Sequence, residues 1–177
     1  FYRSEVASGE EATRESRICD LVPGATVDAH LFDPCGYSMN AQLHESYTTM
    51  HITPQAEFSY VSFETNTRLA NYAALVRAVL SLFRPGRVVV TMFADESGLV
   101  ELKDSVFDHA AIAIPRAGTY RQTNFTKCSF STEQCGLLGN WRLEKDEHEA
   151  GSPVRGNSRS PNPIDDPEAS VSSVEGM

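Results

Sequence analysis

The run Ser46-Tyr-Thr-Thr-Met-His-Ile-Thr53, followed at once by Pro54, predicts one strand of a sheet in this chain. Its β-branched and aromatic residues favour a strand, and the proline ends that strand. Two neighbouring runs, Val27–Phe32 and Phe58–Phe63, alternate apolar and polar residues. This alternation is the pattern of a half-buried strand, so we expect three strands of one sheet.

A single clear helix is predicted after these strands. Asn66 or Thr67 is the candidate N-cap, and Pro85-Gly86 ends the helix. Apolar residues recur at steps of three and four, the spacing of one helix face, at Leu69, Tyr72, Val76, Val79 and Phe83.

Strands are predicted in most of the remaining chain. Arg87–Ala94 has the composition of a buried strand, and residues 106–114 and 119–131 are further strand candidates. Residues 1–18 are polar and charged without a clear apolar period, so we expect a loop there. Many strands with one long helix packed against them predict an α+β fold with a mainly antiparallel sheet.

The character of the chain changes around Glu144. Residues 144–177 hold four prolines, many serines and no aromatic residue, and eight acidic side chains outnumber three basic ones. Such a segment buries too little apolar surface to offset its ordering entropy. We therefore expect one folded domain, residues 1–143, and an acidic disordered tail, residues 144–177.

Composition argues against several classes of function. The net charge is −9 and no basic patch is apparent, so no nucleic acid is expected as a partner. No apolar run approaches the roughly 20 residues that span a bilayer, and no signal core is visible, which favours a cytoplasmic protein. A reducing compartment and the absence of Cys-x-x-Cys spacing predict free thiols and no metal site at Cys19, Cys35, Cys128 and Cys135.

Two residues could carry chemistry if the strands bring them together. Ser38 follows the Pro34-Cys35-Gly36 turn, and a hydroxyl at a strand end is either catalytic or, more commonly, bonded to the turn backbone. His51 lies within a strand and is either a structural histidine or a group that moves protons near neutral pH. Sequence alone leaves both readings open.

Three further side chains have a structural and a functional interpretation. Cys35 has no neighbour in sequence that would lower its pKa, so a small packed residue is favoured over a nucleophile. Glu64 follows an alternating strand and is either a solvated carboxylate or, if it faces inward, a site for a cation. Phe32 is either a core residue or an aromatic surface that stacks on a planar ligand.

Three blocks of this sequence, in this order, resemble the eukaryotic S-adenosylmethionine decarboxylase proenzyme family. They are Phe32-Asp-Pro-Cys-Gly-Tyr-Ser-Met-Asn40, His51-Ile-Thr-Pro54 and Phe58-Ser-Tyr-Val-Ser-Phe-Glu-Thr-Asn66. The resemblance covers about three quarters of the chain and places it in the C-terminal portion of the family. It implies part of a four-layer αββα sandwich, of which this chain would be most of the second half.

The resemblance also implies a reaction and a cofactor. Members of this family cleave their own chain at a serine, which becomes a pyruvoyl group. The pyruvoyl carbonyl forms a Schiff base with S-adenosylmethionine and accepts electrons as CO₂ leaves, in the pathway to spermidine and spermine. The processed serine lies in the family's N-terminal half, so we expect this chain to be a fragment that is inactive alone. Its partners would be that N-terminal half and the β chain of the same proenzyme.

Individual residues take roles by resemblance. Ser38 matches the serine that supports processing and proton handling, and His51 matches the histidine that takes the proton in the β-elimination. Phe32 matches the aromatic that stacks on adenine. Gln55 stands where the family has a glutamate that bonds the ribose hydroxyls, so a charge-assisted bond is lost.

A second group of residues matches the site where putrescine activates some family members. Glu64 matches an acid of the buried charge network, and Phe93 and Phe125 match aromatics that line that region. Thr123 stands where many members have a tyrosine. The resemblance therefore leaves activation by putrescine open, as it does the choice between a monomer and a homodimer.

A non-catalytic protein is the alternative function. Some lineages pair an active decarboxylase with an inactive paralogue that activates it in a heterodimer. Gln55 and Thr123 favour this reading, because a protein without catalytic duty is free to lose ligand contacts. Ser38 and His51 favour the enzyme, because an inactive paralogue would be expected to lose them too.

Overall fold

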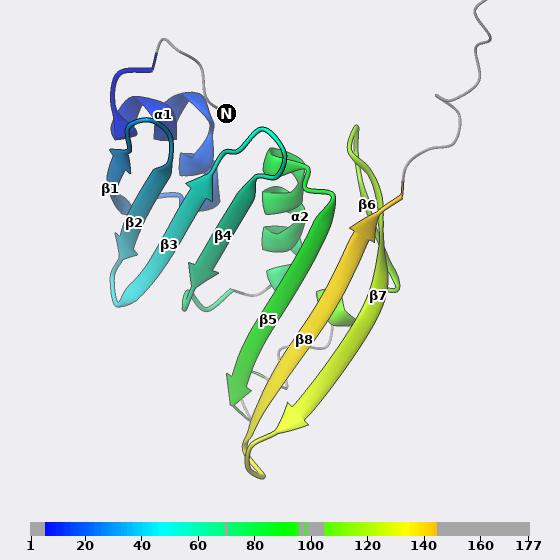
Figure 1. Ribbon diagram of the computed structural model, residues 1–177. Helices are drawn as coiled ribbons and strands as arrows, with labels where there is room; N and C mark the ends of the chain where they lie inside the picture. The colour runs from blue at the N-terminus through cyan, green and yellow to red at the C-terminus, as the bar shows by residue number, and fades with distance from the viewer. Residues whose placement is uncertain (1–5, 70, 96–97, 99–104, 145–177) are drawn as a thin grey trace, which may run out of the picture. The chain divides into compact units, whose positions relative to one another are not determined.

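Two four-stranded antiparallel sheets carry the fold (Figure 1). The structure is a computed structural model that describes residues 6–69, 71–95, 98 and 105–144. The first sheet has the order β1-β2-β3-β4, and the second has the order β5-β8-β7-β6. The α+β class with antiparallel sheets is therefore confirmed. The predicted tail lies outside the described residues, apart from Glu144.

The first sheet is a simple meander. Each strand pairs with the next one along the chain, so the order in space is the order in sequence. Its members are β1 (Thr26–Leu31), β2 (Tyr37–Leu43), β3 (Ser46–Thr53) and β4 (Tyr60–Thr65).

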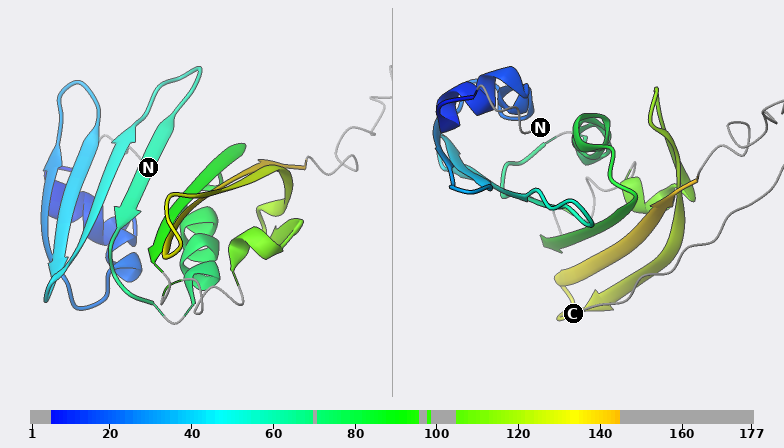
Figure 2. Two further views of the ribbon diagram at one scale, coloured as in Figure 1. Left: turned by 90° about the horizontal axis from the view of Figure 1, so that it is seen from below. Right: turned by 45° about the horizontal axis from the view of Figure 1, so that its top comes forward.

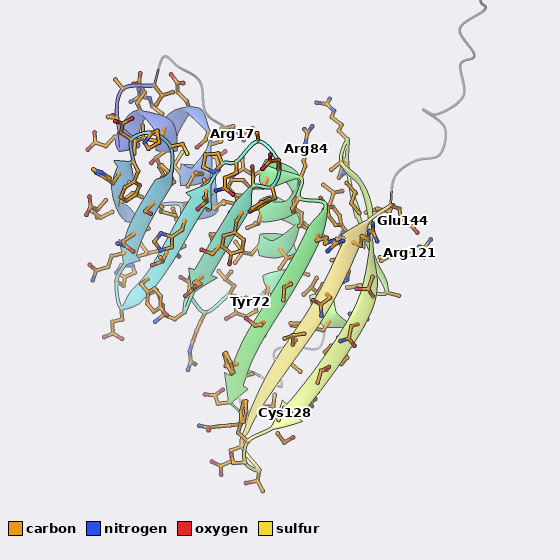
Figure 3. The ribbon with its side chains drawn as sticks, in the orientation of Figure 1. Arg17, Tyr72, Arg84, Arg121, Cys128 and Glu144 are labelled. Carbon is orange, nitrogen blue, oxygen red and sulfur yellow. The ribbon has the colours of Figure 1, made fainter. Side chains whose placement is uncertain are left out.

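The second sheet is longer and is built around its last strand. Its members are β5 (Arg87–Asp95), β6 (Ala111–Ile114), β7 (Gly118–Ser129) and β8 (Gln134–Leu143), with β8 between β5 and β7. An ion pair between Arg121 and Glu144, together with the bond from Glu144 N to Thr119 O at 2.8 Å, ties the chain after β8 to β7 (Figure 3).

In the described part of the chain, helices cover one face of each sheet and the other face carries no helix (Figure 2). The helix α1 (Gly9–Glu15) and the 3-10 helix η1 (Ile18–Leu21) pack on the first sheet. The helix α2 (Tyr72–Phe83) contributes to both cores, because Leu80 packs with the second sheet and Phe83 with the first. The inward side chains of the first sheet include Tyr37, Met39, Ala41, Met50 and Ile52.

The predicted loop at residues 1–18 is wrong over α1. Ser8 caps this helix, since its Oγ accepts from Glu11 N at 3.2 Å. The buried face consists of Gly9, Ala12 and Thr13, which are too small or too polar to give an apolar period. Gly9 is required for the close approach, because a Cβ there would lie 2.2 Å from the carbonyl oxygen of Ala29.

The start of α2 also differs from the prediction. Asn71, not Asn66 or Thr67, caps the helix by accepting from Ala74 N at 3.0 Å. Asn66 instead accepts from Tyr47 N at 2.7 Å and so closes the end of β4 onto β3. The helix therefore begins one turn later than the apolar spacing from Leu69 predicts.

Two strands and one boundary were missed. β2 was not predicted because it begins directly after the predicted bend. β8 was not predicted because it contains glycines, which are depleted in strands. Gly139 sits in β8 because a Cβ there would lie 2.2 Å from the Trp141 ring. The strand predicted over 106–114 begins instead with the 3-10 helix η3 (Val106–Asp108), and only β6 is extended.

Candidate active site

Ser38 and His51 meet on the open face of the first sheet. They are direct cross-strand partners in β2 and β3, and Ser38 Oγ lies 2.7 Å from His51 Nδ1. Paired residues of an antiparallel ladder lie on the same face, which is why the register brings these two side chains together. The contact that sequence reasoning left open therefore exists.

This pair has the chemistry of a nucleophile or acid beside its base. When Nδ1 is the unprotonated nitrogen, the Ser38 hydroxyl donates to it, and the imidazole can accept that proton. His51 is exposed and Ser38 is half-buried, so both are open to a group brought to this face. A hydroxyl and an imidazole at hydrogen-bond distance can hold or move a proton between them.

A tight turn places Phe32 beside this pair. The turn closes with Phe32 N donating to Gly36 O at 2.9 Å, contains the cis Asp33–Pro34 peptide, and uses φ of 133° at Gly36. Cys35 Sγ lies 3.6 Å from Pro54 O, which joins the turn to the end of β3. The ring of Phe32 is 48% exposed, so Phe32 is not the core residue of the structural interpretation.

Gln55 follows β3 at the same end of the sheet. A local turn holds its backbone, with Gln55 N donating to Ser59 Oγ at 3.2 Å and Ser59 Oγ donating to Gln55 O at 3.1 Å. The residue is exposed. Its amide is therefore available to a ligand rather than packed in the core.

Glu64 shares the open face with His51. It pairs with Thr49, and Thr49 Oγ1 donates to Asn40 Oδ1 at 2.9 Å, so a polar row crosses β2, β3 and β4. Glu64 is exposed, which matches a solvated carboxylate in this chain. A shallow hollow of 460 Å³ lies on the same face, and its lining includes Asp28, Asn40, Tyr47 and Thr49.

The resemblance assigns Phe93 and Phe125 to one region, but the structure places them on opposite faces of the second sheet. Phe93 pairs with Gly136 and Phe125 pairs with Gly139. These two glycines are an odd number of residues apart in β8, so their partners lie on opposite faces of the sheet. Phe93 is 79% exposed and stacks on Phe130 at 6.1 Å between ring centroids. Phe125 instead lies 5.7 Å from Phe107 on the helix side.

The reason for this separation is a register shift in β7. The irregularity falls between Gln122 and Asn124, at Thr123, whose hydroxyl lies 3.3 Å from Asn140 O. A bulge of this kind reverses the alternation of side chains beyond it. A sequence pattern does not show such a shift.

One residue of this face was missed. His30 in β1 is the direct cross-strand partner of Ser38, on the side opposite His51. The signal was present, because Asp28, His30 and Phe32 occupy the exposed positions of the alternating run.

Within the described residues, no group of three or more His, Cys, Asp and Glu side chains could hold a metal ion, and all four cysteines are free.

Comparison with known proteins identifies the family of this chain. Residues 1–138 match the family described as adenosylmethionine decarboxylase. The chain belongs to this family. A relative from Dictyostelium discoideum, an S-adenosylmethionine decarboxylase proenzyme, is 48% identical over 96 residues, which cover 54% of this chain and 25% of the relative. The corresponding proenzyme of Drosophila melanogaster is 37% identical over 131 residues, which cover 73% of this chain and 37% of the relative.

A solved adenosylmethionine decarboxylase structure shares the fold. The AdoMetDC-delta26 monomer of Trypanosoma brucei aligns with a TM-score of 0.63 and 28% identity, over 78% of this chain and 56% of that chain. By sequence, the matched part of the chain covers about a quarter and less than two fifths of the two relatives above.

In the part of the chain that the structure describes, no helix has the length and apolar character needed to cross a membrane.

Proposed function

We propose that this chain is the C-terminal, α-chain portion of a pyruvoyl-dependent S-adenosylmethionine decarboxylase, a carboxy-lyase of spermidine and spermine synthesis. The observation that carries the proposal is the 2.7 Å contact between Ser38 Oγ and His51 Nδ1 on an open sheet face. It gives a member of this family the proton-moving pair that both self-cleavage and decarboxylation need.

The residues of the open face fit a carbonyl cofactor presented by another part of the protein. A half-buried hydroxyl and an exposed imidazole face the site, and an exposed aromatic ring lies at the adjacent strand end. When bound, a pyruvoyl group supplies an electron sink for the departing carboxylate. We place its source, the processed serine, in the N-terminal half of the proenzyme.

His51 and Ser38 divide the work of proton handling. The imidazole takes at its unprotonated Nε2 the proton whose removal allows β-elimination, and Ser38 Oγ holds the neutral imidazole in position by accepting from Nδ1–H. In decarboxylation the Ser38 hydroxyl can donate a proton, and His51 can then supply this hydroxyl with another. Phe32 stacks on the adenine, and the Gln55 amide bonds the ribose hydroxyls.

Glu64 is the residue of this chain that we assign to a cationic activator such as putrescine. Its carboxylate lies on the open face, two residues along β4 from Ser62, the partner of His51. A diamine there would sit on the same sheet face as the catalytic pair. We further propose a cytoplasmic enzyme, either monomeric or a homodimer, whose N-terminal half covers this face.

Release of CO₂ from S-adenosylmethionine by the complete protein tests the proposal. The Ser38→Ala and His51→Ala variants should each lose most of the activity or fail to process. Ser62→Ala is the matched control, because Ser62 is the other direct neighbour of His51 on the same face. Full activity in His51→Ala, or equal loss in Ser62→Ala, would contradict the roles assigned here.

A non-catalytic activating paralogue is the second candidate. Gln55 favours it by lacking the carboxylate of the family, and Thr123 favours it because it stands where many members have a tyrosine. Under this alternative the complete protein stays uncleaved, releases no CO₂ alone, and raises the rate of an active decarboxylase in a heterodimer.

A further inference from the structure

His30 lies in the same polar row as the catalytic pair. β1 pairs His30 with Ser38, and β2 pairs Ser38 with His51, so the hydroxyl has an imidazole on each side along the sheet. Direct partners have Cβ atoms about 4.5–5.5 Å apart in an antiparallel ladder. His30 is exposed on this face, yet the roles proposed above leave it without a task.

The ring of His30 contacts the ring of Phe32. Their ring centroids lie 4.6 Å apart and the ring planes meet at 73°, an edge-to-face arrangement. This geometry is the favourable one for two aromatic rings, because it sets the positive edge of one against the negative face of the other. The two residues are two apart in sequence, and each projects from the same side of the extended chain.

The turn supports Phe32 on another side. A Cβ at Gly36 would lie 3.3 Å from Phe32 Cβ and 3.5 Å from Phe32 Cδ2, so the ring rests against the bare glycine backbone. Phe32 N also donates to Gly36 O at 2.9 Å. The backbone of Phe32 is therefore held by the turn, and its ring contacts the ring of His30.

We propose that His30 is a positioning residue that holds the Phe32 ring as a preformed platform for a planar ligand ring. The inference rests on the proposed function, in which that ligand ring is adenine. An edge-to-face contact biases the ring between orientations by roughly two- to tenfold. Without this bias a smaller fraction of the protein holds the Phe32 ring in place, and the apparent affinity for the ligand falls in proportion to that fraction.

This role differs from that of a second proton carrier beside Ser38. A positioning ring needs only its shape and its aromatic edge, whereas a proton carrier needs a titratable nitrogen. His30→Phe keeps the ring and removes both nitrogens, while His30→Ala removes the ring as well. The two variants therefore separate the two roles.

The experiment measures binding of 5′-methylthioadenosine, an adenine nucleoside without the reactive amine, to the complete protein by calorimetry. His30→Ala should weaken binding two- to tenfold, and His30→Phe should restore it. In steady-state kinetics His30→Ala should raise KM with kcat and processing unchanged. The control His44→Asn changes an exposed histidine at the β2–β3 turn, where φ is 53°, and should leave binding unaltered.

A double-mutant cycle then asks whether His30 acts through Phe32. In the Phe32→Ala background, His30→Ala should cause no further loss. An equal loss in both backgrounds, no loss in either, or failure of His30→Phe to restore binding would overturn the proposal. Equal thermal unfolding midpoints of all variants would exclude a folding defect.

A spectroscopic measurement separates failure of this inference from failure of the proposed function. Ring-proton contacts between labelled His30 and Phe32 report the arrangement without any ligand. If the wild-type protein neither processes nor binds the nucleoside, the proposed function fails. The ring contacts, with their loss in His30→Ala, still decide whether His30 orders Phe32.

Discussion

Ser38 Oγ lies 2.7 Å from His51 Nδ1 because the register of β2 and β3 makes the two residues direct partners. The contact does not depend on a long loop. Tyr37 and Met39, the neighbours of Ser38, are buried on the opposite face, as are Met50 and Ile52 beside His51. A slip of either strand by one residue would bury its catalytic candidate and expose its two apolar neighbours, so the core itself fixes the pair.

The first prediction is that Ser38 and His51 act as one unit. Each single alanine variant should slow processing or decarboxylation by about 10²–10⁴-fold, the usual contribution of positioned acid–base groups. The double variant Ser38→Ala/His51→Ala should be no slower than the worse single variant, because either change removes the same proton path. Single-turnover kinetics of the complete protein measure this. Losses that multiply would indicate two independent roles.

Gln55→Glu should strengthen binding of the nucleoside part of the substrate. Restoring a carboxylate converts a neutral hydrogen bond to a ribose hydroxyl into a charge-assisted one, a gain of about 1 kcal/mol or roughly fivefold in affinity. The residue is exposed in a local turn, so the isosteric change should leave folding intact. Calorimetric titration with 5′-methylthioadenosine is the check. Unchanged affinity would mean that Gln55 does not contact the ribose.

Loss of the hydroxyl should have different effects on the free energy of unfolding at two buried tyrosines, Tyr37 and Tyr120. Thr13 Oγ1 lies 2.7 Å from Gly9 O, which can only accept, so Tyr37 donates to Thr13 at 2.6 Å and joins α1 to β2. Tyr37→Phe should cost about 1 kcal/mol in the free energy of unfolding. Tyr120 OH is buried and, within the described part of the chain, has no hydrogen-bond partner. Tyr120→Phe should therefore be neutral or stabilising in urea unfolding, and a loss as large as that of Tyr37→Phe would contradict this account.

Alkaline pH should destabilise the fold through the same tyrosines. Burial raises the pKa of Tyr37, which the Thr13 hydrogen bond partly offsets, and burial raises the pKa of Tyr120 against the opposing charge of Arg84. The unfolded chain releases these protons near pH 10, while the folded chain retains them. Their contribution is thus fully present below about pH 10 and is lost as the pH rises above it.

The measurement for this prediction is the free energy of unfolding between pH 8 and pH 11. The wild-type protein should lose stability faster above pH 10 than the variant Tyr37→Phe/Tyr120→Phe. The two profiles should run parallel below that pH. Parallel profiles over the whole range would mean that other groups control the alkaline transition.

Much of the first sheet was predictable from sequence. The alternation in Val27–Phe32 and the β-branched run at 46–53 gave β1 and β3 to within one residue. The strand β2 was not predicted, although Tyr37, Met39 and Ala41 alternate with polar residues, because the run begins directly after the bend predicted at residues 34–36. Without β2 the register of Ser38 against His51 could not be derived.

Other features depend on packing that the sequence does not display. The helix α1 buries small residues, so its face has no apolar period. The bulge at Thr123 puts Phe125 on the helix side, and a resemblance by residue type does not report the side of a sheet. His30 was recognisable as a polar position in a strand, but the edge-to-face arrangement of its ring with Phe32 depends on the rotamers of the two side chains, which a sequence pattern does not report.

The intact masses of the complete gene product, after expression and purification, distinguish a self-processing decarboxylase from a protein that is not cleaved. Two chains are expected, the larger one containing Ser38 and His51 and beginning with a pyruvoyl group. His51→Ala should shift the product towards a single chain. A wild-type protein that stays one uncleaved chain would contradict a self-processing decarboxylase and favour the non-catalytic paralogue.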